Sequence, residues 1–563
     1  MLNTPLPYVE VSTMTIQPVI NPLWQAVALN VAQQPDNPLI TEDQTKITAG
    51  AWWQRVQAMA AAFAQQGVQP GDRVGLLLSN QEAFLTALFA TWQVGAVPVP
   101  LNIQLPPDDI AYLIQFTACR TLVALPQWTA LFENPALAPV WQALRPTVVL
   151  VQPPGQSLPQ ASDALQWLGY GDILQEAAQA AEAGHFQPAL PVAIDPDACQ
   201  LMMVTSGTTG KPKAVMLSIN NLLSNMAGFS DIIGFIPSDC VLLALPLFHC
   251  YGLIIGLYVM TLGARIVLVP NFQPKTIVQR VIDERVTVLP LVPTMFSFLT
   301  KQVAHLGPEP FAALRLCVSG GASLPPALLQ ELQSAANLTV IEGYGLTETA
   351  PVLAVNDPTA GAIPGSVGKP LPNLTLRLWD DEAQAAIAWT PGTESAVGEI
   401  QAKGPNVMLG YYQRPEDTQA VFTPDGWFAT GDLGHFDAHG RLYISGGRKK
   451  DLIIKAGENI APLRIEQVLY AHPAVLEACV MGLPHATLGE DIGAVVVLHS
   501  HLGATALEND QPPDWPQVLR QHCREHLPPF MVPTSIRVWE SLPKNATGKI
   551  VKPDVKAQWQ EQP

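Results

Sequence analysis

Positive charge is scarce in this sequence of 563 residues. Lysine and arginine together number 30 against 47 aspartates and glutamates, which leaves a net charge of −17 at pH 7. A chain with this charge is repelled by nucleic acids and by anionic membranes, so neither is expected as a nonspecific partner. The exception is a basic cluster, Arg441, Arg448, Lys449, Lys450 and Lys455. Positive charge is therefore concentrated where it could meet phosphate groups.

Cysteine is also sparse, and its arrangement excludes two common scaffolds. The seven cysteines are odd in number and form no Cys-x-x-Cys pair: Cys119, Cys199, Cys240, Cys250, Cys317, Cys479 and Cys523. Neither a disulfide framework nor a structural zinc site is predicted. The first residues lack the basic and apolar segments of a secretory signal peptide. These features predict a reducing, cytoplasmic location.

Long uninterrupted apolar runs are missing. The nearest candidate, residues 240–264, has no Asp, Glu, Lys or Arg and is long enough to cross a bilayer. Pro246, His249 and Gly252 interrupt it. The pattern favours a buried strand followed by a buried helix over a membrane span. We therefore expect no transmembrane segment, and peripheral contact with a membrane stays open.

The sequence does contain enough apolar residues for more than one domain. They make up 48% of the chain against 14% charged residues, as in a large globular enzyme. Short apolar strands alternate with helical stretches, with strands at 73–78, 97–100 and 121–124 and helices at 83–94 and 108–116. This alternation is typical of βα units on a parallel sheet. Residues 153–197 show only weak helical spacing and are expected to form an elaborated connection.

The periodicity changes towards the C-terminal end. From residue 374 short strands and turns replace the βα alternation, and glycines at 446 and 447 directly precede Arg448, Lys449 and Lys450 of the basic cluster. We predict an α/β fold with two domains, residues 1–447 and 448–563. The first is a large domain of parallel βαβ sheets plus a small β subdomain, and the second is a small α+β domain.

A polar loop lies between two apolar runs at 201–218. It consists of Thr205, Ser206, Gly207, Thr208, Thr209, Gly210 and Lys211, followed by Pro212 and Lys213. Glycine lets backbone N–H groups approach a ligand, and the hydroxyl and ammonium groups add donors. A Walker A loop does not fit, since Pro212 stands where that motif has Ser or Thr. A polar hairpin turn and a polyphosphate loop of another kind both stay open.

Two glycine-containing segments downstream add a candidate nucleotide site. A predicted strand ending at Ser319 is followed by Gly320, Gly321 and Ala322, where a flat ring could pack against the backbone. The second segment resembles a dinucleotide fingerprint except for its glutamate and reads Gly343, Tyr344, Gly345, Leu346, Thr347, Glu348 and Thr349. A carboxylate beside a phosphate requires an intervening cation, so Glu348 indicates Mg²⁺. A capping or solvated glutamate is the alternative.

Asp432 and Lys549 are weak signals when each is taken alone. Asp432 lies in a glycine-flanked turn, and Lys549 lies on a glycine-containing loop near the C-terminus. Most such residues are turn formers or solvated side chains. Together with the segments described above, however, they follow the order and spacing of one family over roughly residues 30–555. The sequence resembles the AMP-forming acyl-CoA synthetases of the adenylate-forming enzyme superfamily.

This resemblance implies a ligase that converts a carboxylic acid, expected to be a fatty acid, to an acyl-adenylate with ATP and then to an acyl-CoA with coenzyme A. Thr205 and Glu348 would hold Mg²⁺, and the catalytic residues would be Lys549, Glu348 and His249. The nucleotide and coenzyme A would be bound by Thr205, Ser206, Gly207, Thr208, Thr209, Gly210, Lys211, Gly320, Gly321, Ala322, Gly343, Tyr344, Gly345, Thr347, Asp432, Arg448 and Gly457. The C-terminal domain would be mobile, turning about a hinge near Lys450 between the two half-reactions.

Two positions depart from the family pattern, since Ala214 replaces a common Gly and Ile219 a common His. The acceptor stays open, because a fatty acyl-AMP ligase or an adenylating module would load an acyl or amino acid onto a carrier-protein phosphopantetheine. Modules that activate amino acids commonly have Asp where this chain has His249, which favours acids without an α-amino group. A binding protein that has lost the chemistry is disfavoured by the presence of Glu348 and Lys549. The acid would be surrounded by residues 249–256, 294–299 and 318–322.

Overall fold

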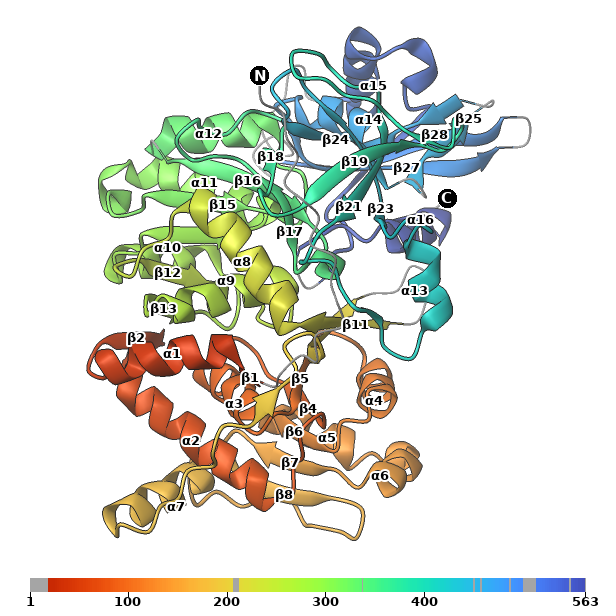
Figure 1. Ribbon diagram of the computed structural model, residues 1–563. Helices are drawn as coiled ribbons and strands as arrows, with labels where there is room; N and C mark the ends of the chain where they lie inside the picture. The colour runs from red at the N-terminus through yellow and green to blue at the C-terminus, as the bar shows by residue number, and fades with distance from the viewer. Residues whose placement is uncertain are drawn as a thin grey trace, which may run out of the picture.

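The computed structural model describes residues 19–205, 212–336, 338–448, 451–455, 458–485, 488–499, 513–545 and 548–561. Figure 1 shows the red and orange N-terminal segment below, the yellow and green segments above it, and the blue C-terminal segment at the upper right. The predicted α/β class is confirmed, because the nine-stranded sheet and one of the five-stranded sheets consist mainly of parallel strands with helices packed on them.

The first sheet holds five parallel strands in the order β5-β4-β6-β7-β8. They are β4 (Arg73–Leu77), β5 (Val97–Pro100), β6 (Thr121–Ala124), β7 (Thr147–Leu150) and β8 (Gln166–Gly169). The helices of this part are α1 (Pro22–Gln33), α2 (Ala49–Gln65), α3 (Glu82–Gln93), α4 (Pro107–Phe116), α5 (Thr129–Phe132), α6 (Ala138–Leu144) and α7 (Tyr170–Glu182). Every residue of α3 is buried, because α3 packs against both the sheet and α2. The expected connection at 153–197 thus contributes a strand, β8, and a helix, α7.

The second sheet holds nine strands in the order β18-β17-β16-β15-β14-β12-β13-β2-β3. They are β2 (Pro38–Glu42), β3 (Thr45–Thr48), β12 (Cys240–Leu243), β13 (Arg265–Leu268), β14 (Val288–Leu291), β15 (Leu316–Ser319), β16 (Val340–Gly345), β17 (Val352–Val355) and β18 (Lys369–Pro370). Its helices are α8 (Ile219–Ile233), α9 (Cys250–Thr261), α10 (Pro274–Asp283), α11 (Pro293–Leu306) and α12 (Pro326–Ala336). The buried elements β12 and α9 are the expected strand and helix of the apolar stretch. Across the described ranges, no helix has the length and apolar character that crossing a bilayer requires.

An antiparallel sheet of three strands joins these layers: β10 (Cys199–Thr205), β11 (Lys213–Ser218) and β22 (Gly410–Tyr411). The predicted strands on both sides of the polar loop are therefore present. The β subdomain is a five-stranded antiparallel sheet of β19 (Thr375–Asp380), β20 (Ala385–Ala386), β21 (Gly398–Lys403), β23 (Phe428–Phe436) and β24 (Leu442–Arg448), with α13 (Pro415–Val421) nearby. The short strands β1 (Val19–Ile20) and β9 (Ala193–Ile194) pair with each other.

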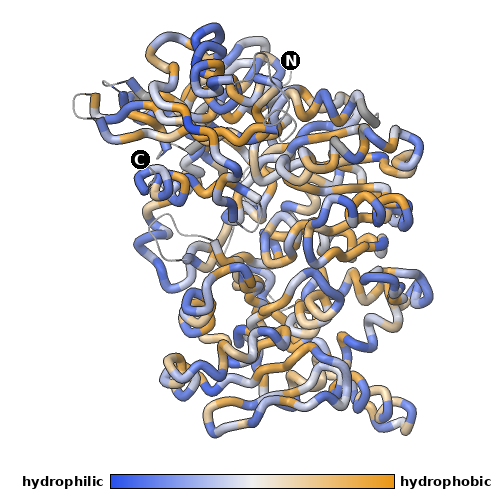
Figure 2. Tube along the Cα trace, turned by 180° about the vertical axis from the view of Figure 1, so that it is seen from behind, coloured by the Kyte–Doolittle hydropathy of each residue, from blue (hydrophilic) through white to orange (hydrophobic). Residues whose placement is uncertain are grey.

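The C-terminal segment has the predicted α+β composition. Its elements are β25 (Ile453–Lys455), β26 (Glu458–Ile460), α14 (Pro462–Tyr470), β27 (Val475–His485), β28 (Gly489–Leu498), α15 (Trp515–His526), β29 (Ser535–Trp539) and α16 (Lys552–Glu561). Two hydrophobic clusters lie wholly between residues 453 and 559, so this segment has a core of its own. Figure 2 shows hydrophobic residues along the inner strands and hydrophilic residues on the outer helices and loops.

One carboxylate ties together the amino ends of three parallel strands. Asp239 directly precedes β12, and its Oδ1 accepts hydrogen bonds from Nε of Arg315 at 2.9 Å and from Oγ1 of Thr287 at 2.7 Å. Burial alone would raise the pKa of Asp239, but the bonds from Arg315, Ile236 and Thr287 lower it below the usual value. Asp239 is therefore ionised near pH 7 and stabilises the amino edge of the sheet.

Replacing Asp239 with Asn should lower the free energy of unfolding at pH 7 by about 1–3 kcal/mol, because charge-assisted bonds to Arg315 are lost. Because the pKa of Asp239 is lower in the folded than in the unfolded protein, its charge stabilises the fold fully only above the unfolded-state pKa. The difference in stability between variant and wild type should therefore shrink as the pH falls below 3.8. Urea midpoints at pH 7 and at more acidic pH measure the effect, with the exposed Asp163→Asn as control. A difference that is independent of pH would show that Asp239 does not act through its charge.

Candidate active site

The carboxyl ends of the parallel strands β12, β14, β15 and β16 lie at one edge of the nine-stranded sheet. His249 follows β12, Thr294 follows β14, residues 320–322 follow β15, and residues 343–345 end β16. The hydroxyl of Tyr251 donates to a carbonyl of β15 at 2.9 Å and so connects two of these segments. Open α/β sheets bind ligands at this edge. The fold thus brings four predicted segments together.

Glu348 lies on a short turn, η4 (Thr347–Thr349), directly after β16. Two buried amides hold this turn, since Nδ2 of Asn225 and Nδ2 of Asn406 donate to its last carbonyl oxygen at 3.2 and 2.8 Å. Oε1 of Glu348 accepts a hydrogen bond from the hydroxyl of Tyr411 at 2.8 Å. A carboxylate has further lone pairs, so Oε2 retains capacity for another partner.

Thr205 is the last residue of β10, and its backbone pairs with that of Lys213 at the start of β11. β11 pairs in turn with β22 and contacts η4, so Thr205 and Glu348 belong to neighbouring elements. Within the described ranges, no three His, Cys, Asp or Glu side chains converge as a metal site. One carboxylate and one hydroxyl suit Mg²⁺, which takes its other oxygen ligands from substrate phosphates and water. The rest of the predicted phosphate loop lies outside the described residues: Ser206, Gly207, Thr208, Thr209, Gly210 and Lys211.

Tyr344 and Asp432 contact each other although they lie on different sheets. The hydroxyl of Tyr344 on β16 donates to Oδ2 of Asp432 on β23 at 2.7 Å. Asp432 is buried, and its backbone pairs with that of Arg448 on β24. Three residues predicted to bind the nucleotide therefore meet between the sheet edge and the β subdomain. Gly457 lies outside the described residues.

His249 is the N-cap residue of α9. Burial lowers the pKa of its imidazole to about 4, so the ring is neutral near pH 7. Its buried Nε2 has no hydrogen-bond partner among the described residues, and neither does the buried Oγ of Ser319 at the end of β15. Leaving such atoms unpaired costs about 1–3 kcal/mol each. Both atoms belong to the segments at the sheet edge, where a bound ligand could supply partners.

Lys549 is carried by a loop of the C-terminal segment that reaches the nine-stranded sheet. Its N–H donates to Oδ1 of Asn545 at 2.9 Å, and an isolated bridge closes the loop. The neighbouring Gly548 has φ +76°, and a Cβ on it would lie 2.6 Å from Oγ1 of Thr294. The loop therefore rests against the start of α11, at the predicted wall of the acid pocket.

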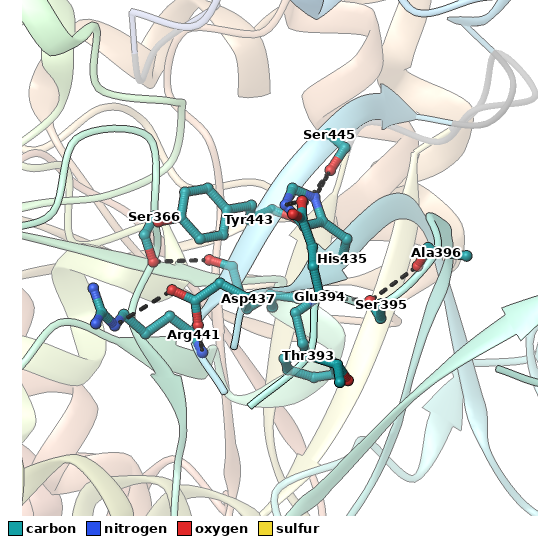
Figure 3. Close-up of polar contacts among 12 residues, drawn as sticks. Ser366, Thr393, Glu394, Ser395, Ala396, His435, Asp437, Arg441, Tyr443 and Ser445 are labelled. Carbon is teal, nitrogen blue, oxygen red and sulfur yellow. Dashed lines mark hydrogen bonds and ion pairs between the residues drawn. The ribbon is translucent and has the colours of Figure 1, made fainter. Parts of the chain in front are cut away.

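A cavity of about 420 Å³ lies where α14 meets the β subdomain. Of the residues drawn in Figure 3, His435, Tyr443 and Ser445 line this cavity, and the ring of His435 stacks on Tyr443 with centroids 5.0 Å apart. Nε2 of His435 lies 3.2 Å from Oε1 of Glu394, and Nδ1 contacts Ser445. The α14 wall consists of Arg464, Gln467 and Tyr470, followed by Ala471. None of the predicted site residues lines this cavity, so it marks the contact between the two parts of the chain.

Glu342 on β16 is a buried carboxyl that the sequence analysis did not single out. Its Oε1 accepts a hydrogen bond from the N–H of Leu324 at 2.9 Å, which fixes the chain just after residues 320–322. Burial raises the pKa of Glu342 to about 8, although the bond from Leu324 acts in the opposite direction. Its position directly before Gly343 was an available signal. Tyr411 was missed too, and nothing local in the sequence links it to Glu348.

Replacing Glu342 with Gln should stabilise the protein relative to wild type at alkaline pH. The native carboxyl stays protonated up to about pH 8, whereas the unfolded one ionises near 4.5. Wild-type stability should therefore fall with rising pH across this interval, by about 1.4 kcal/mol per pH unit, and the variant lacks this loss. Melting temperatures at acidic, neutral and alkaline pH measure it, with the exposed Glu331→Gln as control. Parallel pH profiles of variant and wild type would show that native Glu342 is ionised.

Two protein-family models match the chain, the AMP-binding enzyme model at residues 27–412 and the AMP-binding enzyme C-terminal domain model at residues 464–549. A sulfoacetate–CoA ligase of Cupriavidus necator is 33% identical, with 94% of this chain and 97% of that protein covered. A feruloyl-CoA synthase of an Amycolatopsis species is 31% identical, with 93% and 96% covered.

The solved structure of ATP-bound MatB from Rhodopseudomonas palustris has the same fold, with a TM-score of 0.82 and 29% identity over 96% of this chain and 99% of that one. The predicted enzyme class is confirmed: the protein is an acid–thiol ligase that acts through an acyl-adenylate. Its reactants are a carboxylic acid, ATP and coenzyme A, with Mg²⁺ as the metal. The chain belongs to the family of AMP-binding enzymes, as an AMP-forming acyl-CoA synthetase.

Proposed function

We propose that this ligase activates carboxylic acids with an uncharged, apolar tail, such as fatty or aryl acids. One observation carries the proposal: the expected pocket walls, residues 249–256, 294–299 and 318–322, contain no Asp, Glu, Lys or Arg. Several of their side chains are buried in the hydrophobic core, including Leu253, Met295 and Phe296. A second anionic group on the acid would be desolvated there without a cation, which is unfavourable.

The two relatives bracket this proposal. The sulfoacetate–CoA ligase is named for an acid that carries a second anionic group, whereas the feruloyl-CoA synthase is named for an aryl acid. Because the proposed walls here offer no cationic side chain, we assign this chain to the second kind of substrate. The neutral imidazole of His249 likewise offers no charge to pair with an α-amino group.

In this proposal the predicted residues hold the nucleotide and the metal. Thr205 to Lys213 hold the β- and γ-phosphates, and the segments 320–322 and 343–347 hold the nucleoside together with Asp432 and Arg448. The hydrogen bond between Tyr344 and Asp432 supports a common role. Glu348 and Thr205 are the protein ligands of Mg²⁺, which neutralises phosphate charge when bound.

The chemistry proceeds in two half-reactions. The substrate carboxylate attacks the α-phosphorus of ATP, and pyrophosphate leaves. The ammonium of Lys549 stabilises negative charge on the carboxylate and α-phosphate oxygens. The bound acid provides a polar partner for Nε2 of His249, which has none among the described residues. The thiol of coenzyme A then attacks the acyl carbon and loses its proton, the thioester bond forms, and AMP leaves. Gly457 is one of the residues proposed to bind coenzyme A.

We divide the chain into two domains, residues 1–447 and 448–563. In the proposal the smaller domain rotates relative to the larger one before the second half-reaction. Two observations support this rotation. The C-terminal segment has hydrophobic clusters of its own, and Gly548 packs closely against Thr294. A cytoplasmic location is also part of the proposal. All seven cysteines have free thiols, which suits a reducing compartment.

A pyrophosphate-release screen tests the substrate class. Medium-chain fatty acids or aryl acids should be turned over at least about 10-fold faster than malonate, sulfoacetate or α-amino acids, since pocket contacts discriminate on this scale or more. Acyl-CoA measured by mass spectrometry should appear only when coenzyme A is added. Faster turnover of malonate, sulfoacetate or an amino acid than of every apolar acid would overturn the proposal. Adenylate formation without acyl-CoA would point instead to a carrier protein as acceptor.

Lys549→Ala should lower acyl-adenylate formation by about 10²-fold or more, the usual effect of removing one charge-stabilising contact. The variant should still convert supplied acyl-adenylate to acyl-CoA, because this step does not need the lysine. Lys556→Ala, at a partly exposed lysine of α16, is the matched control and should leave both steps unchanged. Equal losses in both half-reactions for Lys549→Ala would show that its role is not confined to adenylation.

A further inference from the structure

The carboxylate of Glu348 is held by a residue from a distant part of the chain. The hydroxyl of Tyr411 donates to Oε1 at 2.8 Å, and the backbone N–H of Met408 donates to the carbonyl of Glu348 at 2.8 Å. Tyr411 is only 7% exposed, so its hydrogen bond is shielded from bulk water. Hydrogen bonds are stronger in such a low-dielectric environment than in water. Both the side chain and the backbone of Glu348 are therefore bound to the segment around β22.

The backbone of Tyr411 is fixed from two sides. On one side it pairs with Val215 of β11, the strand that leaves the phosphate loop. On the other side its N–H donates to Oγ1 of Thr418 on α13 at 2.9 Å. Gly410 permits this close packing, because a Cβ there would lie 2.8 Å from Cγ2 of Thr418. The position of the tyrosine ring thus follows from the strand that carries the loop.

The ring of Tyr411 also contacts the ammonium group of Lys213, the first residue of β11 after the phosphate loop. Nζ of Lys213 lies 4.8 Å from the ring centroid and 3.0 Å from Oδ1 of Asp417 on α13. Lys213 is the residue whose backbone pairs with Thr205. A cation over an aromatic face is attracted to it and holds the ring in place. A continuous set of contacts therefore runs from the end of the loop through Tyr411 to Glu348.

We propose that Tyr411 is a positioning residue that orients Glu348 for Mg²⁺ and couples that carboxylate to the phosphate loop. The inference rests on the proposed role of Glu348 as metal ligand. With Oε1 bound by the hydroxyl, Oε2 is the oxygen left for the ion. Hydrogen-bond partners of this kind commonly change metal affinity or activity by about 10–100-fold when they are removed.

Tyr411→Phe removes only the hydroxyl and keeps the ring under Lys213. The affinity for ATP should be measured by equilibrium dialysis without any acid, once in excess Mg²⁺ and once in EDTA. The ratio of the two affinities is the coupling between metal and nucleotide. We expect the variant to lower this ratio about 10-fold or more, with the EDTA affinity unchanged. The Mg²⁺ concentration for half-maximal adenylation should rise by a similar factor, with the rate recovering at saturating Mg²⁺.

The neighbouring Tyr412→Phe is the matched control. Its hydroxyl accepts a hydrogen bond from Nε2 of Gln413 at 3.2 Å, and its ring packs edge-on against Phe116. It should leave the ratio unchanged. In a Glu348→Gln background, Tyr411→Phe should add less than about 2-fold, because the carboxylate through which it acts is gone.

An unchanged ratio in Tyr411→Phe, or a loss of equal size in Mg²⁺ and in EDTA, would overturn the proposal. So would a full additional loss in the Glu348→Gln background. The dialysis contains no acid, so it is independent of the substrate class. If wild type itself shows no coupling between Mg²⁺ and ATP, the metal assignment fails and the positioning role fails with it. A normal coupling in wild type with an inactive apolar-acid screen would refute only the substrate class.

Discussion

The parallel pairing of β12, β14, β15 and β16 is the constraint on which the site depends. Parallel strands point the same way, so the chain leaves each of them at the same edge of the sheet. His249, Thr294, Gly320 and Gly343 lie far apart in the sequence, and this pairing alone gathers them. The β subdomain and the loop of Lys549 then approach that edge from outside, through Asp432 and Gly548.

Stability and chemistry are divided between the two ends of these strands. At the amino ends, the carboxylate of Asp239 is satisfied by Arg315 and Thr287. At the carboxyl ends, His249 and Ser319 each keep a buried polar atom without a partner among the described residues. Native proteins rarely tolerate such atoms unless a ligand or a water completes them. Other buried polar atoms of the described residues also have no partner, so these two support a ligand site at the carboxyl edge only together with the segments gathered there.

The spacing of apolar residues in the sequence predicted much of the fold, because strands and helices repeat their apolar residues at different periods. β5 and β6 have the predicted bounds, and the strands flanking the polar loop are present. β8 and α7 were not predicted, because the apolar residues within 153–197 show only weak helical spacing. The contacts within the site could not be predicted locally: Tyr411 reaches Glu348 only because β22 pairs with β11. The roles of the site residues came from family resemblance and stay predictions.

The approach of Gly548 to Thr294 bears on how one site can serve two half-reactions. In the proposed mechanism Lys549 acts only in the first half-reaction, so the loop that carries it would withdraw from Thr294 before the thiol of coenzyme A attacks. The C-terminal segment keeps its own hydrophobic clusters, and these share no residue with the clusters of the nine-stranded sheet. Withdrawal would therefore break contacts between the two parts, at Gly548 and where α14 packs on β24, and leave both sets of hydrophobic clusters intact. Because core packing carries most of the stability of a domain, the proposed alternation between arrangements is compatible with a stable fold.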